Sequence, residues 1–205
     1  MSTGLAQKIR NAVRGLVQRY GPASLKRHLW NREFSTGRWT CLERTVGEGV
    51  HLQVEKYANR GGILDLGCGP GTISVEVNPE TYSFYTGVDV SDVAIQKART
   101  RSHEVGRADR NEYCQSDILT YTPTRQYNVI LYGDSIYYIG NRQIAPMLCR
   151  YSTYLTKHGV FIARIHDVSG KLQHIIDIVE SRFDVVEKHI HEQTQTCIIV
   201  FRPRT

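Results

Sequence analysis

The sequence predicts an α/β fold: a doubly wound seven-stranded sheet that is mostly parallel, with helices on both faces and an N-terminal helical extension. The first observation is the apolar run 63–66, which is typical of a buried parallel strand. It leads into a turn with glycine at every second position, where positive φ and close approach to a ligand are allowed. These glycines are Gly67, Gly69 and Gly71.

The second observation is an acidic residue after the next strand. The run 83–89 ends in Asp89, eighteen residues beyond Gly71. A glycine-rich turn before a helix points free N–H groups at a ligand, and an acid at this distance reaches ribose hydroxyls. The sequence therefore predicts a nucleoside-cofactor site. A dinucleotide fingerprint is excluded, because Thr72 stands where glycine or alanine is needed.

The third observation concerns the C-terminal end of the chain. Strands predicted at 183–190 and 196–202 are joined so closely that they must pair antiparallel. The last strand is therefore expected to run against an otherwise parallel sheet. Further strands are predicted at 112–115, 127–131 and 160–165, and helices at 43–58, 72–77, 93–100, 143–155 and 171–181.

The pattern Asp-x-Gly-x-Gly-x-Gly that begins at Asp65 resembles motif I of the class I S-adenosylmethionine-dependent methyltransferases, and the resemblance covers roughly residues 60–203. It implies a Rossmann-like methyltransferase domain over 41–205 with S-adenosyl-L-methionine as the cofactor. Asp117 resembles the family residue that accepts a hydrogen bond from the adenine amino group, and the alternative is a turn or cap residue. The expected cofactor-binding residues are Asp65, Gly67, Cys68, Gly69, Gly71, Asp89, Val90, Asp117, Ile118, Arg38 and Trp39.

Residues 1–40 are expected to form a basic helical arm and an aromatic lid. Residues 5–20 place apolar side chains on one helical face, and Pro22 suits the first turn of a short second helix that ends near Trp30. Seven basic residues precede the first acidic residue, Glu33. Three interpretations remain open: a helix that packs on the body, an interfacial helix drawn to anionic lipid or an anionic substrate, and a mitochondrial presequence.

A loop rich in aromatic residues is predicted over 30–39. In related methyltransferases this segment commonly covers the cofactor, so Arg38 or Trp39 is expected to close over its carboxylate and sulfonium ends. The pattern W-x-x-E-F-x-x-G-x-W is similar to small methyltransferases of bacterial polysaccharide and secondary-metabolite pathways. This closer resemblance implies a small-molecule or glycan acceptor.

The acceptor is expected at the carboxyl ends of the strands, near the switch in strand order. His166 follows the predicted strand 160–165, and histidine is the usual general base near neutral pH, so it is the first choice of general base, although it could be a capping or solvent-facing residue. Asp134 and Tyr137 are alternatives. Methyltransferases of nucleobase amino groups carry N/D-P-P-Y/F here, but this chain lacks both prolines.

Composition narrows the function further. The excess positive charge lies in the arm, and the remainder has 19 basic against 20 acidic residues, which argues against nucleic acid as the substrate. Five scattered cysteines and no C-x-x-C motif favour a cytoplasmic protein with reduced thiols and no metal site. No apolar run reaches the ~18 residues of a membrane span, and no signal-peptide core follows the start.

The sequence favours methyl transfer to a hydroxyl of a small molecule or sugar. Transfer to a small-molecule amine, methylation of RNA, and a catalytically silent binding subunit are the alternatives. Peripheral association with an anionic membrane through residues 5–32 stays open, and nothing in the sequence indicates the oligomeric state.

Overall fold

A computed structural model describes residues 2–37, 49–167 and 170–204 of the chain. Its centre is one seven-stranded sheet in the order β3-β2-β1-β4-β5-β7-β6. Six strands run parallel, and β7 lies antiparallel between β5 and β6, which confirms the predicted fold class. The strands are β1 (Gly62–Leu66), β2 (Phe84–Asp89), β3 (Asn111–Gln115), β4 (Tyr127–Gly133), β5 (Leu155–His166), β6 (Phe183–His191) and β7 (Thr196–Pro203).

Two helical layers cover the sheet. One face packs against α3 and α5 through a core that includes Val54 and Ile95, and the other packs against α6 and α7 through Leu148 and Val179. All five residues of β1 are buried, as expected for a central strand covered on both faces. The helices of this part are α3 (Val50–Ala58), α4 (Thr72–Glu76), α5 (Asp92–Glu104), α6 (Asn141–Ser152) and α7 (Gln173–Arg182).

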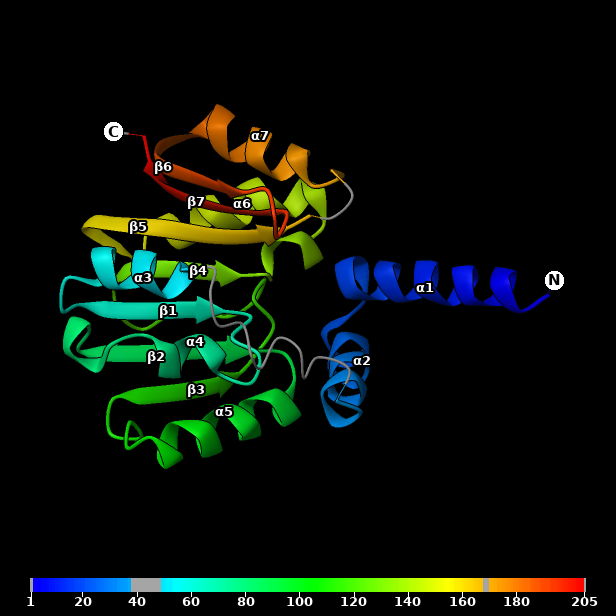
Figure 1. The fold of residues 1–205 in the computed structure, drawn as a ribbon, viewed down its shortest axis with the longest axis horizontal. Helices are drawn as coiled ribbons and strands as arrows, with labels where there is room; N and C mark the ends of the chain where they lie inside the picture. Colours follow the sequence, from blue (N-terminus) through cyan, green and yellow to red (C-terminus); the bar gives the residue numbers. More distant parts are fainter. Residues whose placement is uncertain (1, 38–48, 168–169, 205) are drawn as a thin grey trace.

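The N-terminal helices α1 (Ser2–Tyr20) and α2 (Ala23–Ser35) lie beyond the carboxyl ends of the parallel strands, toward which the strand arrowheads point (Figure 1). The prediction of a loop after Trp30 was wrong, because α2 continues for another turn to Ser35. No glycine or proline interrupts residues 31–35, and the Thr36 hydroxyl donates to the Arg32 carbonyl at the helix end. Arg38 and Trp39 lie outside the described residues, as do residues 43–48 of the predicted helix 43–58.

Within the described ranges, no helix combines the length and apolar character needed to cross a membrane.

A cavity at the carboxyl edge of the sheet

A cavity lies where the carboxyl ends of β1 to β5 meet the N-terminal helices. Its free space is about 1270 Å³ when the part open to solvent is included. Small-molecule sites typically enclose about 300–1,000 Å³, so a nucleoside cofactor and a small acceptor have room here together. The cavity is at the edge where doubly wound sheets bind their ligands.

Three glycines in the turn after β1 have positive φ, but each needs glycine for a different reason. A Cβ on Gly67 would lie 2.4 Å from Cβ of Ser135, so a side chain would push the end of β1 away from the segment after β4. A Cβ on Gly69 would meet only the Phe34 ring, 3.7 Å away, which leaves the space above this backbone open. A Cβ on Gly71 would lie 2.9 Å from Cβ of Ala98 in α5.

The glycine turn is therefore divided between ligand binding and packing. Gly67, Cys68 and Gly69 line the cavity, as the sequence predicts. Gly71 is not among the lining residues, and its close approach to Ala98 shows that it is needed where α5 packs on the turn.

Asp89 at the end of β2 is bonded to the glycine turn. One carboxylate oxygen accepts from the Gly69 amide at 2.9 Å, and the other accepts from the Ser91 amide at 2.8 Å. Burial raises the pKa of Asp89 to about 6, and the hydrogen bonds from these amides oppose that rise. The carboxylate thus fixes the shape of the turn while it lines the same cavity as its neighbour Val90.

Asp65 at the base of the cavity is the second buried acid. The Tyr85 hydroxyl donates to Oδ2, and Oδ1 has no hydrogen-bond partner among the described residues. Burial raises the pKa of Asp65 to about 7, and the nearby charge of Asp89 adds to the rise. A buried carboxylate oxygen without a partner is costly, so this position favours a ligand with a cationic hydrogen-bond donor.

Asp117 and Ile118, which follow β3, also line the cavity. The Asp117 carboxylate is already held on both sides: Oδ2 lies 3.0 Å from Nζ of Lys26 in α2, and Oδ1 accepts from the Leu119 amide at 2.9 Å. Both side chains of the ion pair are less than 10% exposed. The expected contact with adenine stays a prediction, and Lys26 competes for the same carboxylate.

The side of the cavity after β4 contains the expected acceptor residues Asp134 and Tyr137. Asp134 has a φ of 57° and pairs through Oδ2 with Arg164 of β5, while Oδ1 is buried without a partner in the described part of the chain. Burial raises the pKa of Tyr137 well above its usual range, so this phenol is neutral and a poor base.

His166 does not lie in the cavity. β4 ends at Gly133, which pairs with Arg164, so His166 extends two residues past the strand that borders the site. Its side chain is exposed, and Nδ1 is 3.5 Å from Oγ1 of Thr196. The role of His166 as general base stays an untested prediction, and the geometry favours Asp134 in its place.

Several cavity residues were not predicted from the sequence. Lys26, Trp30 and Phe34 stand at four-residue intervals on α2 and form the wall opposite the sheet. Lys26 and Trp30 lay within the predicted second helix, but the wrong prediction of a loop over residues 31–35 left Phe34 out of the series. Arg164 could have been predicted, because it is the one charged residue within the apolar strand predicted at 160–165. No sequence signal identifies Gln18 and His51, which also line the cavity.

Aromatic side chains join α2 to the acceptor side. The Trp30 ring meets the Tyr138 ring edge-on with centroids 4.9 Å apart, and Tyr138 lies against Tyr137 at 4.7 Å. The Arg19 side chain of α1 donates to the Tyr137 carbonyl at 3.2 Å. The N-terminal helices therefore form part of the site, in addition to extending from it.

Comparison with known proteins agrees with this arrangement. The model of a methyltransferase domain family matches residues 59–198. A 27-O-demethylrifamycin SV methyltransferase of Amycolatopsis mediterranei (strain S699) is 25% identical over 128 residues, which are 58% of this chain and 47% of that protein. The chain thus spans about half the length of the curated relative it matches.

Two solved structures show the same fold at low identity. The N-methyltransferase NodS from Bradyrhizobium japonicum WM9, in complex with S-adenosyl-L-homocysteine, has a TM-score of 0.69 and 16% identity, covering 87% of this chain and 98% of NodS. Magnesium protoporphyrin IX methyltransferase from Synechocystis PCC 6803, with bound S-adenosylmethionine, has a TM-score of 0.63 and 16% identity, covering 94% of this chain and 96% of that enzyme.

The family match covers more than half of the chain and includes the glycine turn, Asp89 and the acceptor side. It confirms the expected S-adenosylmethionine-dependent, class I assignment. The chain belongs to the methyltransferase domain family.

Proposed function

We propose that this chain transfers the methyl group of S-adenosylmethionine to a hydroxyl of a neutral small molecule or sugar. The observation that carries the proposal is the pairing of charges around the cavity. Lys26 is paired with Asp117 and Arg164 with Asp134, so the acceptor side has little net charge to offer a ligand. Of the carboxylates among the described lining residues, Asp117 and Asp134 are the two in ion pairs, and Asp65 and Asp89 have no ionic partner in the described part of the chain.

The two unpaired acids suit the cofactor. The open backbone at Gly69 allows close approach, and the Asp65 oxygen without a partner matches the ammonium group of the cofactor's amino-acid end. Asp89 would accept from the ribose hydroxyls through lone pairs that its two amide bonds leave free. When bound, S-adenosylmethionine supplies an electrophilic methyl group on a sulfonium, so positioning and exclusion of water are the tasks left to the protein.

The acceptor side supplies the group that takes the proton. Asp134 Oδ1 is buried and free to accept a hydrogen bond, and Arg164 holds the carboxylate in place through Oδ2. Asp134 Oδ1 would hold the acceptor hydroxyl and take its proton, while bound S-adenosylmethionine would supply the methyl group and leave as S-adenosylhomocysteine. The rings of Trp30, Tyr137 and Tyr138 offer apolar faces on which a planar or sugar ring can pack.

A small-molecule amine is the second candidate acceptor. Asp134 Oδ1 could also accept a hydrogen bond from an amine N–H, and NodS, which has a similar fold, is an N-methyltransferase. A protonated amine would, however, prefer an uncompensated carboxylate, and Arg164 compensates Asp134. RNA is disfavoured for the opposite reason, since phosphates need unpaired basic groups at the site.

Transfer of a labelled methyl group over a panel of acceptors tests the proposal. The panel contains hydroxylated glycans and phenols, matched amines, and RNA. We expect turnover on neutral hydroxyl compounds, with the label recovered as an O-methyl group. Exclusive transfer to amines or to RNA would contradict the proposal, and cofactor binding without turnover on any acceptor would favour the silent binding subunit.

A further inference from the structure

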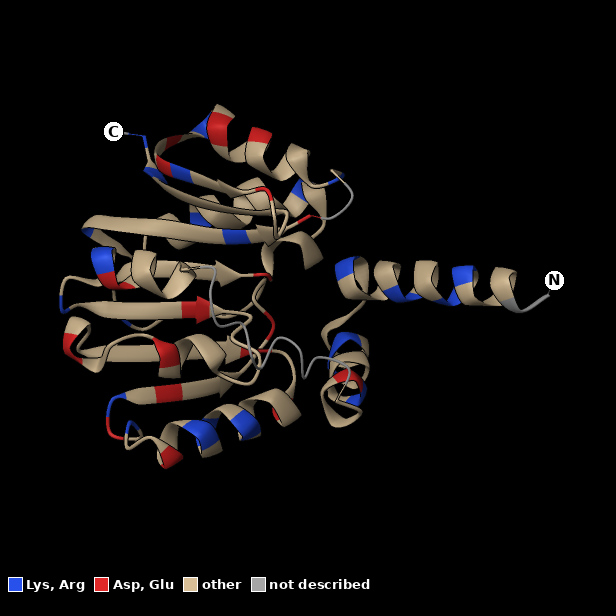
Figure 2. Cartoon of the chain, in the orientation of Figure 1, with Lys and Arg blue, Asp and Glu red and all other residues tan. Residues whose placement is uncertain are grey.

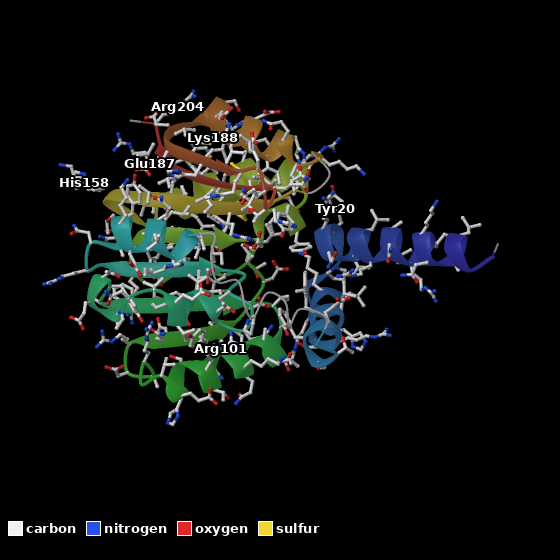
Figure 3. The ribbon with its side chains drawn as sticks, in the orientation of Figure 1. Tyr20, Arg101, His158, Glu187, Lys188 and Arg204 are labelled. Atoms are coloured by element: carbon white, nitrogen blue, oxygen red, sulfur yellow. The ribbon has the colours of Figure 1, made fainter. Side chains whose placement is uncertain are left out.

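The exposed surface of α1 carries an apolar face that nothing in the described structure covers. Helix α1 extends away from the body, and its side chains project into open space (Figures 1 and 3). The large apolar side chains on it are 53–65% exposed. They are Leu5, Ile9, Val13, Leu16 and Tyr20.

This apolar face points away from the body. Gln18 is buried against the cavity and Arg14 pairs with Glu33 of α2, so these two residues mark the inner side of the helix. Ile9 precedes Gln18 by nine residues, which is about two and a half turns of an α-helix, and therefore lies on the opposite side. The helix thus contacts the protein through polar side chains and leaves its apolar side free, the reverse of an ordinary surface helix.

Positive charge surrounds the apolar face. Figure 2 shows basic and no acidic residues along α1, in agreement with the sequence. Lys8, Arg10 and Arg19 lie toward its two edges by helical position and have no acidic partner in the ranges that the structure describes. An apolar stripe bordered by lysine and arginine, with no acid on the helix, has the charge and shape that suit an anionic lipid surface.

We propose that α1 binds in the plane of an anionic membrane, with Leu5, Ile9, Val13, Leu16 and Tyr20 inserted among the acyl chains and the basic residues at the level of the headgroups. The inner end of the same helix belongs to the site: Gln18 lines the cavity, and Arg19 bonds to the Tyr137 carbonyl. Membrane binding through α1 therefore places the mouth of the cavity beside the lipid surface.

Co-sedimentation of the full chain with vesicles tests this proposal without any methyl acceptor. One set of vesicles is pure phosphatidylcholine, and the other contains about 30% phosphatidylglycerol, which gives the negative surface potential that basic segments recognise. We expect binding to the anionic vesicles only. The double variant Ile9→Glu/Leu16→Glu should lower the partition coefficient more than about tenfold, because charge replaces the inserted side chains.

The charge variant and a matched control separate the two contributions. Lys8→Gln/Arg10→Gln should weaken binding to anionic vesicles about twenty-five-fold, since each basic residue near such a surface contributes about a fivefold factor. Ile190→Glu on β6 changes an apolar residue of similar exposure, 66%, outside α1, and should bind like the wild type. All of these positions are exposed, and circular dichroism verifies that the variants fold.

Three results would overturn the proposal. The first is equal binding of wild type to neutral and anionic vesicles, or no binding to either. The second is unchanged binding by Ile9→Glu/Leu16→Glu. The third is a wild type that is dimeric in light scattering and a double variant that is monomeric. That result would assign the apolar face to a second copy of the chain.

Discussion

The ammonium group of Lys26 lies 3.0 Å from a carboxylate oxygen of Asp117, and 91 residues of chain separate the two. The pair joins the first turn of α2 to the segment that follows β3, at the wall of the cavity. Both side chains are nearly excluded from water, so removing one charge while the other remains strongly destabilises the folded protein. This buried contact is one of those that hold α2 over the site.

Lys26→Met should therefore destabilise the protein by about 3 kcal/mol, because Asp117 is left buried without its partner. Urea denaturation measures the loss, and Lys26→Met/Asp117→Asn should recover most of it. Arg27→Met is the matched control: its pair with Asp92 is about half exposed and screened by water, so its loss should leave the stability close to that of the wild type. Equal losses for Lys26→Met and Arg27→Met would show that the Lys26 pair is not buried as described.

Gln18→Met tests whether α1 contacts the acceptor. The Gln18 side-chain nitrogen is buried without a described hydrogen-bond partner, and the residue lines the cavity. Methionine keeps the volume and removes an unsatisfied donor, so stability should stay level or rise by about 1 kcal/mol. We expect a higher KM for the acceptor with unchanged cofactor affinity. A normal KM would show that Gln18 does not contact the acceptor.

Cofactor affinity should depend on pH through the two buried acids. In the free protein, burial raises the pKa of Asp65 to about 7 and that of Asp89 to about 6, so the folded state binds more protons than the unfolded chain between about pH 4 and 7. The stability of the free protein therefore falls as pH rises through that window. Bound cofactor favours the ionised carboxylates, so the affinity for the cofactor should increase as pH rises. The increase is at most about tenfold per pH unit for each proton released.

Calorimetry with S-adenosylhomocysteine in buffers of different ionisation enthalpy measures this proton release. We expect affinity to increase from about pH 5.5 to 7 and then to level. Asp65→Asn should flatten the upper part of the curve, because Asp65 is the one of the two acids whose pKa is raised to about 7. An affinity that is constant over this range, with no proton release, would show that neither acid faces the cofactor.

Most of the residues predicted around the glycine turn line the cavity, whereas His166, the first choice of base, does not. The difference lies in how far apart along the chain the contributing residues are. The glycine turn and Asp89 lie on adjacent strands, and spacing along the chain is enough to place them together. The prediction placed Gly71 in the turn, where it lies. Its packing against Ala98 depends on the position of α5, which cannot be predicted from the spacing of residues along the chain.

The acceptor side depends on contacts between distant segments. Lys26 and Asp117 are 91 positions apart in the sequence, and no local sequence pattern predicts their ion pair. His166 was predicted from the position of a strand end, but β5 runs past the end of β4, so the cavity is lined by Arg164 instead. The register of two neighbouring strands decides which residue reaches the site, and one sequence does not reveal that register.

The most direct test of the proposed chemistry compares Asp134→Asn with His166→Ala on the same hydroxylated acceptor. Asparagine tolerates the left-handed backbone at position 134 and keeps the side-chain shape while it removes the base. We expect Asp134→Asn to lower kcat by about 10²–10⁴-fold and His166→Ala to change it by less than about threefold, with the affinity for S-adenosylhomocysteine unchanged in both. A large loss in His166→Ala beside a nearly normal Asp134→Asn would contradict the account and return the role of base to His166.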